Sequence, residues 1–305
     1  MKTYFITGGA GFIGSSLSEQ LIKKGNKVVA IDNFCDFYNP KIKENNIKEL
    51  QKNPNFKIYK KDIRDKQSIK KIFDENNIDI VMHLAAMAGV RPSIENPVLY
   101  QEVNCMGTQN ILEEMKAHNI KNLVMASSSS VYGDDGTQKS PYAVSKATNE
   151  LQAAMYSNLS NTKFTGLRFF TVYGEGIRED LAISKFIKSI KNNEPIYVYG
   201  DGTQSRDFTY VDDITEAISL ILESDKEWKN EVFDIGYGES TTVNELIEIL
   251  KEFINPTFDK VVYQDEKPYD VKATLANTNK LYEWFGFKPK YNIKKGLQKW
   301  QTELK

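Results

Sequence analysis

The sequence predicts an α/β protein with a doubly wound parallel sheet and a smaller C-terminal α/β part. Strand-like and helix-like segments alternate from the first residue to about residue 170. A glycine-rich turn at 7–14 separates the first strand from the first helix, and an acidic residue ends the second strand. Repeated strand–helix–strand units favour a parallel sheet covered on both faces, with right-handed crossovers.

The N-terminal half holds the regular alternation. We expect a charged, solvated surface helix at 41–52. Buried apolar runs predict strands, and apolar residues at helical spacing predict helices. The strands are expected at 2–7, 27–32, 56–59, 78–86, 122–128 and 162–170, and the helices at 12–25, 97–118 and 141–159.

The pattern becomes irregular from about residue 171. We expect helices at 180–192, 213–223 and 242–253, a strand at 196–200, an aspartate-rich turn at 212–213 and a basic amphipathic helix at 291–305. These segments suggest two domains. Residues 1–170 would form a Rossmann-type dinucleotide-binding domain, to which segments from about 207–237 return, and 171–305 a substrate-binding domain.

Composition excludes several classes of protein. A net charge of −1 over 305 residues argues against nucleic-acid binding. No apolar run approaches the ~18 residues of a membrane span. MKTYFITGG leads directly into a strand, which leaves no room for a signal peptide. Two cysteines make no disulfide framework, which favours a reducing cytoplasm, and two histidines argue against a metal site.

The turn TGGAGFIG carries Gly8, Gly11 and Gly14 in the spacing G-x-x-G-x-x-G. Such glycines permit a tight turn, a close approach of backbone N–H groups to a pyrophosphate, and close packing of the helix. Asp32 ends the second strand, where the hydroxyls of an adenosine ribose would lie, and this favours NAD over NADP. The alternative is a plain turn with Asp32 as a helix cap. Asp62 and Ile63 are candidate adenine contacts, or Asp62 is an ordinary N-cap.

Three further residues suggest acid–base chemistry. Tyr142 and Lys146 are four positions apart at the start of a helix, so they share one face. A nearby ammonium and an oxidised nicotinamide would lower the tyrosine pKa from its usual ~10 and make it a base. Ser128, at the carboxyl end of the fifth strand, can hydrogen bond to the same substrate hydroxyl. The alternative is a surface tyrosine beside a solvated lysine.

These motifs resemble the extended short-chain dehydrogenase/reductase family, and within it the nucleotide-sugar 4-epimerases. The resemblance rests on TGGAGFIG, DNF, HLAA, SSSSVYG, YAVSK, LRFFTVYG and RDFTYVDD. It implies that NAD is held through the cycle, Tyr142 is the base on the sugar 4-hydroxyl, Lys146 holds the nicotinamide ribose and Ser128 assists. It adds as cofactor-binding candidates Phe12, Ile13, Asn33, Leu84, Ala85 and Ala86.

One branch of that family resembles this chain most. Dehydratases carry an Asp-Glu pair before V-Y-G, where this chain has Ser129-Ser130. DNFCDFYNPKIKENN and AGVRPSIENP are similar to the UDP-glucuronate 4-epimerases. That likeness implies that Ser128, Ser129 and Thr171 bind the sugar carboxylate. Arg178 and Arg91 would balance its charge, unless Arg91 is a helix-cap or interface residue.

The nucleotide half of the substrate is expected in the C-terminal domain. Arg206 resembles the arginine that clamps the UDP diphosphate, a bidentate role; the alternative is a surface salt bridge. Lys267 stands where the family usually has a second phosphate arginine. Asp270 would accept from the uridine ribose, and Thr274 matches a small position that admits bulky C2 or C5 substituents. The segment between Tyr132 and Tyr142 is shorter than in relatives, and EGI at 175–177 replaces the usual P-W-G.

The leading hypothesis is therefore an NAD-dependent UDP-sugar 4-epimerase, an isomerase, with UDP-glucuronate ahead of UDP-glucose and UDP-N-acetylglucosamine. The alternatives are a nucleotide-sugar dehydratase or reductase and a non-catalytic NAD-binding protein. Helices 97–118 and 141–159 resemble those of the family's dimeric four-helix bundle, which predicts a homodimer.

Overall fold

A seven-stranded parallel sheet forms the centre of the computed structural model, which describes residues 1–133, 136–267 and 271–300. Its strand order is β10-β6-β5-β4-β1-β2-β3, and each neighbouring pair is parallel. The strands are β1 (Thr3–Thr7), β2 (Lys27–Asp32), β3 (Phe56–Lys60), β4 (Ile80–His83), β5 (Asn122–Ser128), β6 (Lys163–Phe169) and β10 (Asn230–Ile235). The predicted fold class is confirmed, and the order reverses between β1 and β4.

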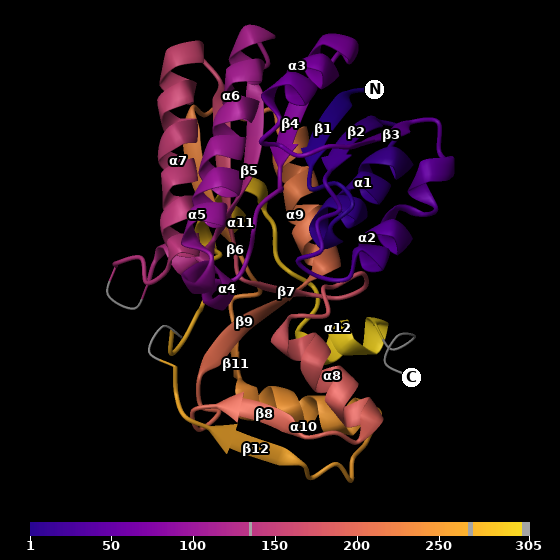
Figure 1. Ribbon diagram of the computed structural model, residues 1–305, viewed down its shortest axis with the longest axis vertical. Helices are drawn as coiled ribbons and strands as arrows, with labels where there is room; N and C mark the ends of the chain where they lie inside the picture. Colours follow the sequence, from indigo (N-terminus) through magenta and orange to yellow (C-terminus); the bar gives the residue numbers. More distant parts are fainter. Residues whose placement is uncertain (134–135, 268–270, 301–305) are drawn as a thin grey trace.

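Helices cover both faces of this sheet (Figure 1). On one face α1 (Phe12–Lys23) packs against α9 (Val211–Glu223), and on the other α6 (Gly107–Ala117) packs between α3 (Lys66–Glu75) and α7 (Pro141–Ser160). Because side chains alternate along a strand, Tyr4 and Ile6 join one apolar core, whereas Phe5 joins the other.

The C-terminal half adds two small sheets at one end of the molecule, away from the N-terminus (Figure 1). The strands β7 (Thr171–Tyr173), β9 (Ser205–Tyr210) and β11 (Ser240–Thr242) form one, and β8 (Ile196–Tyr199) pairs with β12 (Val261–Gln264) in the other. The helices next to these small sheets are α8 (Ala182–Asn192), α10 (Val243–Ile254) and α12 (Ile293–Lys299), whereas α11 (Asn279–Phe285) packs against β10 of the large sheet.

The segment 41–52 is not the solvated helix that its charge predicts. It forms α2 (Pro40–Ile47) and a 3₁₀ turn η1 (Leu50–Lys52). Ile47 and Leu50 enter the core, and Lys43 is only 6% exposed because it reaches a buried carboxylate. Charge alone misleads here, since a long lysine stem can be buried when its ammonium finds a partner.

Three other elements differ from their predictions. The fourth strand ends at His83 and is followed by a loop and an unpredicted helix, α4 (Val90–Glu95). The helix expected at 97–118 is three consecutive pieces: α5 (Pro97–Tyr100), the π-helical segment η2 (Gln101–Met106) and α6. The turn expected at 212–213 is the first turn of α9, where Asp213 is buried and accepts from two backbone N–H groups, those of Lys290 and Tyr291.

Of the helix predicted at 291–305, the structure has α12 from Ile293 to Lys299, with Asn292 and Trp300 as its caps, and residues 301–305 lie outside the described residues. Leu297 and Trp300 are buried, so this end of the chain packs onto the molecule. No helix in the described ranges is both long enough and apolar enough to cross a membrane.

Candidate active site

The glycine turn joins β1 to α1 at the edge of the sheet where the strand order reverses. Gly8 has a positive φ of 69°, and its carbonyl accepts from the Gly11 N–H at 3.0 Å. A Cβ on Gly14 would lie 2.3 Å from that carbonyl oxygen, so only glycine lets the helix come this close. Gly11 caps α1 without a side-chain hydrogen bond, which leaves the first helical N–H groups available for an anion.

Asp32 ends β2 as predicted, but it is already ion-paired. Its Oδ1 accepts from Lys43 Nζ and from the Phe34 N–H, both at 2.8 Å, and both charged side chains are almost fully buried. Sequence reasoning missed Lys43 because the only signal was a lysine in a charged helix. The Ala10 N–H lies 3.3 Å from Oδ2, so Asp32 also faces the glycine turn.

The third strand leads to Asp62, whose side chain meets Asn33: the Asn33 amide donates to Asp62 Oδ2 at 2.9 Å. Burial opposes ionisation, but hydrogen bonds from Arg64 and Asn33 hold the pKa of Asp62 at about 2. The N-cap of α3 is Asp65, so the alternative interpretation of Asp62 as that cap is wrong. Ile63 packs against Gly107, where a Cβ would lie 2.5 Å from it.

Leu84, Ala85 and Ala86 follow β4 and lie beside the glycine turn. The Thr7 hydroxyl accepts from the Leu84 and Ala85 N–H groups at 3.1 and 3.0 Å. His83 contacts Thr7 Oγ1 through Nδ1 (2.7 Å) and Thr108 Oγ1 through Nε2 (2.8 Å). Complete burial lowers the pKa of His83 to about 3, so the ring is neutral. It supports the turn rather than transferring protons.

Ser128, Tyr142 and Lys146 come together as the sequence predicts. Ser128 ends β5, and Tyr142 lies in the first turn of α7, which Ser140 caps by accepting from the Ala143 N–H. The Ser128 and Tyr142 side chains are hydrogen-bonded. Lys146 is buried, and its ammonium donates to the Ala126 carbonyl on β5 at 2.9 Å.

Burial is the largest influence on the protonation of this group. It raises the pKa of Tyr142, whereas the Ser128 hydrogen bond and the Arg178 charge lower it. Burial also lowers the pKa of Lys146 to about 8. The lowering of the tyrosine pKa expected from Lys146 and an oxidised nicotinamide together stays a prediction.

Further hydroxyl groups follow Ser128 and the neighbouring end of β6. Ser129 begins the short helical turn η3 (Ser129–Val131), and Ser130 donates through Oγ to Ser128 Oγ at 3.0 Å. Thr171 follows Phe169, the residue paired with Ser128 across the sheet. Ser130 was not predicted to act, although it belongs to the same run of four serines.

Arg178 is near Tyr142, but its guanidinium is engaged. It donates from Nε and Nη2 to the two carboxylate oxygens of Asp180 at 2.9 and 2.6 Å, and it stacks on the rings of Phe37 and Tyr38. Arg178 was expected to balance the charge of a substrate carboxylate. Its positive charge is already balanced by Asp180, in a partly buried ion pair.

Four more predicted residues lie in or face the C-terminal half. The β9 residue Arg206 donates to the Ser205 carbonyl at 2.8 Å, and the same carbonyl accepts from the Thr274 N–H. Thr274 Oγ1 is buried without a hydrogen-bond partner. Arg91 and Lys267 both face the ring of Tyr199, at 4.3 and 5.2 Å from its centroid. Asp270 lies outside the described residues.

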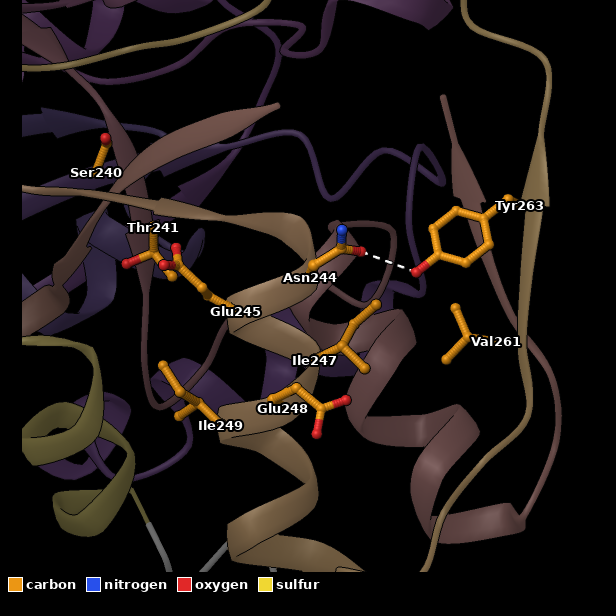
Figure 2. Close-up of a pocket in the computed structure, with 9 residues that line it drawn as sticks. All are labelled: Ser240, Thr241, Asn244, Glu245, Ile247, Glu248, Ile249, Val261 and Tyr263. Atoms are coloured by element: carbon orange, nitrogen blue, oxygen red, sulfur yellow. Dashed lines mark hydrogen bonds between the residues drawn. The ribbon is translucent and has the colours of Figure 1, made fainter. Parts of the chain in front are cut away.

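A separate cavity of about 550 Å³ lies between α10 and β12 (Figure 2). Tyr263 of β12 donates to Asn244 Oδ1 of α10 across it at 3.0 Å. Its lining residues are Ser240, Thr241, Asn244, Glu245, Ile247, Glu248, Ile249, Val261 and Tyr263. None of these is a predicted site residue, so this cavity is distinct from the tyrosine and lysine site.

Together these features define a class of protein. A glycine turn at the point where the strand order reverses can hold a dinucleotide, and a Ser–Tyr–Lys group beside it can move a proton to or from a sugar hydroxyl. A parallel sheet with both groups at its carboxyl edge is the architecture of the short-chain dehydrogenases/reductases.

Comparison with known proteins specifies the family. The model described as GDP-mannose 4,6 dehydratase matches residues 5–300. A UDP-glucuronate 4-epimerase of Thermodesulfobacterium geofontis (strain OPF15) is 40% identical over 317 residues, 99% of this chain and 97% of the relative. The solved UDP-glucuronic acid 4-epimerase of Bacillus cereus, in complex with UDP-glucuronic acid and NAD, superposes with a TM-score of 0.92. It is 32% identical and covers 99% and 98% of the two chains.

A UDP-N-acetylglucosamine 4-epimerase from Methanobrevibacter ruminantium M1, in complex with UDP-N-acetylmuramic acid, gives a TM-score of 0.88. It is 34% identical and covers 99% of this chain and 97% of its own. The chain belongs to the extended short-chain dehydrogenase/reductase family of NAD-dependent nucleotide-sugar epimerases. The predictions of NAD as cofactor and of a nucleotide-sugar 4-epimerase, an isomerase, are confirmed.

Proposed function

We propose that this NAD-dependent UDP-sugar 4-epimerase interconverts UDP-glucuronate and its C4 epimer. The observation that carries the proposal is the run of hydroxyls beside Tyr142. Ser128 ends β5, Ser129 begins the turn that follows it, and Thr171 begins β7 just beyond Phe169, the partner of Ser128 on β6. A C5 carboxylate in this place would need such hydrogen-bond donors. The carboxylate pair that a dehydratase would need is replaced by serines. Relatives named for UDP-glucuronate support the same choice.

The dinucleotide would be held by the turn and the strand ends around it. The α1 N-terminus faces the pyrophosphate, with Gly8, Gly11, Phe12, Ile13 and Gly14 forming that turn. Asp32, oriented by Lys43, accepts from the adenosine ribose through its less engaged Oδ2. Asn33, Asp62 and Ile63 contact the adenine, and Leu84, Ala85 and Ala86 close the opposite side.

The chemical step needs a base at the sugar 4-hydroxyl. Tyr142 removes that proton through Ser128, and Lys146, held against the Ala126 carbonyl, orients the nicotinamide ribose. When bound, NAD would supply the acceptor and the donor of the C4 hydride. After the 4-keto sugar turns over, Tyr142 gives the proton back, so the reaction is redox-neutral.

The uridine diphosphate would lie between the two halves of the chain. Arg206 lies on β9 beside the Thr274 segment, and Arg91 and Lys267 converge on Tyr199 from separate segments. Two cations around one aromatic ring suit a nucleotide with negative phosphates. The role proposed for Asp270 falls on a residue outside the described ranges.

A second candidate substrate is UDP-N-acetylglucosamine or UDP-glucose. Asp180 already neutralises Arg178, which weakens the case for a charged sugar. Thr274 matches the small position that, by resemblance to the family, admits a C2 substituent. A UDP-N-acetylglucosamine 4-epimerase at 34% identity supports this alternative.

Incubation of the purified protein with each UDP-sugar, followed by chromatographic separation of the C4 epimers, tests the proposal. We expect UDP-glucuronate to be turned over with the highest kcat/KM. Faster epimerisation of UDP-glucose or UDP-N-acetylglucosamine would contradict the proposal and identify that sugar as the substrate. Accumulation of a 4-keto product would indicate a dehydratase instead.

Three broader predictions stay part of this proposal. The 1–170 and 171–305 domains would bind NAD and the UDP-sugar, respectively. The free thiols of Cys35 and Cys105 support a cytoplasmic location. The helices η2, α6 and α7 would form a homodimer interface, because η2 exposes Met106 and α7 exposes Val144, Leu151, Met155 and Leu159.

A further inference from the structure

Three polar residues lie in one row across the sheet, one position before the strand end that holds Ser128. Ser127 of β5 pairs with Arg168 of β6, and Arg168 pairs with Asp234 of β10. Residues in register on neighbouring strands point to the same face, so these three side chains lie side by side. None of them belongs to the site already described.

The side chain of Glu150, on α7, contacts this row. Arg168 donates from Nε and Nη2 to its two carboxylate oxygens at 3.0 and 2.8 Å, and Ser127 donates to Oε1. The carboxylate is mostly buried and is held by residues of two strands. Glu150 is one helical turn beyond Lys146 and two beyond Tyr142, so it joins the catalytic helix to β5 and β6.

The same row also reaches the loop after Ser128. The guanidinium of Arg168 stacks on the Tyr132 ring at 4.6 Å, and the Tyr132 hydroxyl donates to Asp234 Oδ1 at 2.7 Å. Asp234 Oδ2 accepts from the Asn277 N–H, three residues beyond Thr274. One continuous set of contacts therefore joins α7, the Ser128 loop and the Thr274 segment.

Glu150 also influences the pKa of Lys146 through its charge. Burial is the largest influence and lowers the Lys146 pKa, while Cys105 of η2 and Glu150 of α7 raise it. His83 of β4 is neutral, and Tyr142 is protonated in the protein alone. Glu150 is thus the carboxylate among the groups that favour the lysine ammonium.

We propose that Glu150 is a positioning residue for epimerisation. Its hydrogen bonds to Arg168 and Ser127 hold α7 against β5 and β6. Tyr142 and Lys146 of α7 thereby stay aligned with Ser128. This inference rests on the roles proposed above for those three residues. It extends them, because Glu150 touches neither the sugar nor the dinucleotide in that arrangement.

Glu150→Gln removes the charge and keeps the shape. We expect kcat to fall about 10-fold or more, with KM for the UDP-sugar changed less than about 3-fold, because misaligned catalytic groups slow the reaction without weakening substrate binding. The alkaline limb of the pH–kcat profile should move about half a unit or more toward acid, since the Lys146 ammonium loses a nearby anion. Glu150→Asp, which keeps the charge, should restore the position of that limb.

Two further variants guard against a fold defect. Ser127→Ala removes one donor to Glu150 and should lower kcat a few-fold at unchanged Tm. Glu231→Gln is the matched control. Glu231 lies on the outer strand β10, and its carboxylate is also ion-paired, to Lys280. This variant should leave kcat and the pH profile as in the wild type.

The outcomes separate three possibilities. An unchanged pH limb, with kcat lowered only in proportion to the folded fraction, would reduce Glu150 to a structural residue and overturn the proposal. Loss of activity together with loss of tightly bound NAD in the Ser127→Ala variant would also contradict it, because the clamp is not expected to hold the dinucleotide. If the wild type epimerises no UDP-sugar, the proposed function fails instead.

Discussion

At the scale of single residues, the Tyr142–Lys146 pair owes its chemistry to burial as much as to spacing. The i, i+4 spacing brings both side chains to one face of α7, but burial raises the tyrosine pKa and lowers the lysine pKa. Burial therefore pushes each group toward its neutral form.

Replacing Tyr142 by Phe removes the proposed base without changing the shape of the helix. We expect kcat to fall by roughly 10²–10⁴-fold, the usual contribution of a positioned acid–base group. Epimer formation measured at saturating UDP-sugar gives kcat, and the absorbance of released NAD should show unchanged cofactor content. Retention of wild-type activity would refute the mechanism.

The lysine gives the activity a pH limit. Lys146 has a pKa of about 8 in the folded protein, below its usual 10.5, so its ammonium is present at lower pH and is lost as pH rises through about 8. We expect kcat to decline across that range. Lys146→Arg, which stays charged, should show no such decline in whatever activity it retains.

The contribution of Lys146 to the free energy of unfolding should change with pH in the opposite direction to kcat. This difference separates an effect on catalysis from an effect on folding. Because the folded pKa is depressed, the unfolded chain binds more protons between about pH 8 and 10.5, and this group's contribution to the free energy of unfolding rises with pH there. An activity loss that tracked a falling Tm would point to alkaline unfolding instead.

At the scale of elements, the β1–α1 turn depends on glycine for packing rather than for flexibility alone. A Cβ on Gly14 would lie 2.3 Å from the Gly8 carbonyl oxygen and 3.0 Å from both the Gly8 carbonyl carbon and Gly9 Cα, and all three contacts are with backbone, which cannot rotate away. The helix must therefore shift if a side chain is added.

Gly14→Ala should destabilise the protein by about 1–3 kcal/mol, the usual cost of overpacking. It should also reduce bound NAD, because the α1 N-terminus moves away from the phosphates. Thermal unfolding and the NAD content of purified protein measure the two effects. Ser16→Ala in the same helix is the control, since it removes only a hydroxyl that donates to the Phe12 carbonyl. Normal NAD content in Gly14→Ala would contradict this account.

At the scale of the whole molecule, the exposed apolar residues of η2 and α7 favour self-association. Leu151 is 73% exposed at the middle of α7, which is unusual for a leucine beside other exposed apolar residues. An isologous helix face is the commonest way to cover such a surface.

Leu151→Glu should convert a dimer into monomers, because two copies would place carboxylates in an apolar interface. Size-exclusion chromatography with light scattering gives the mass directly. Val262→Glu on β12, which also replaces an exposed apolar residue, should stay dimeric. A monomeric wild type would exclude the interface.

The sequence determined the order of most elements, the glycine turn and the Ser128, Tyr142 and Lys146 group. These depend on local spacing, and a parallel α/β sheet brings the ends of its strands to one edge. Periodicity predicted β8 but could not reveal the π-helical segment at 101–106 or the short strands β7, β9, β11 and β12, since their hydrogen bonds depend on packing around them.

Only the tertiary structure decided which charges meet. Lys43 reaches Asp32 from α2, Asp180 occupies Arg178, and Glu150 joins Arg168 and Ser127 from two strands. Whether a lysine in a charged helix is solvated or ion-paired depends on what folds beside it, because only a buried partner repays the loss of water. Local pattern thus fixed the chemistry of the site, and long-range packing fixed its electrostatics.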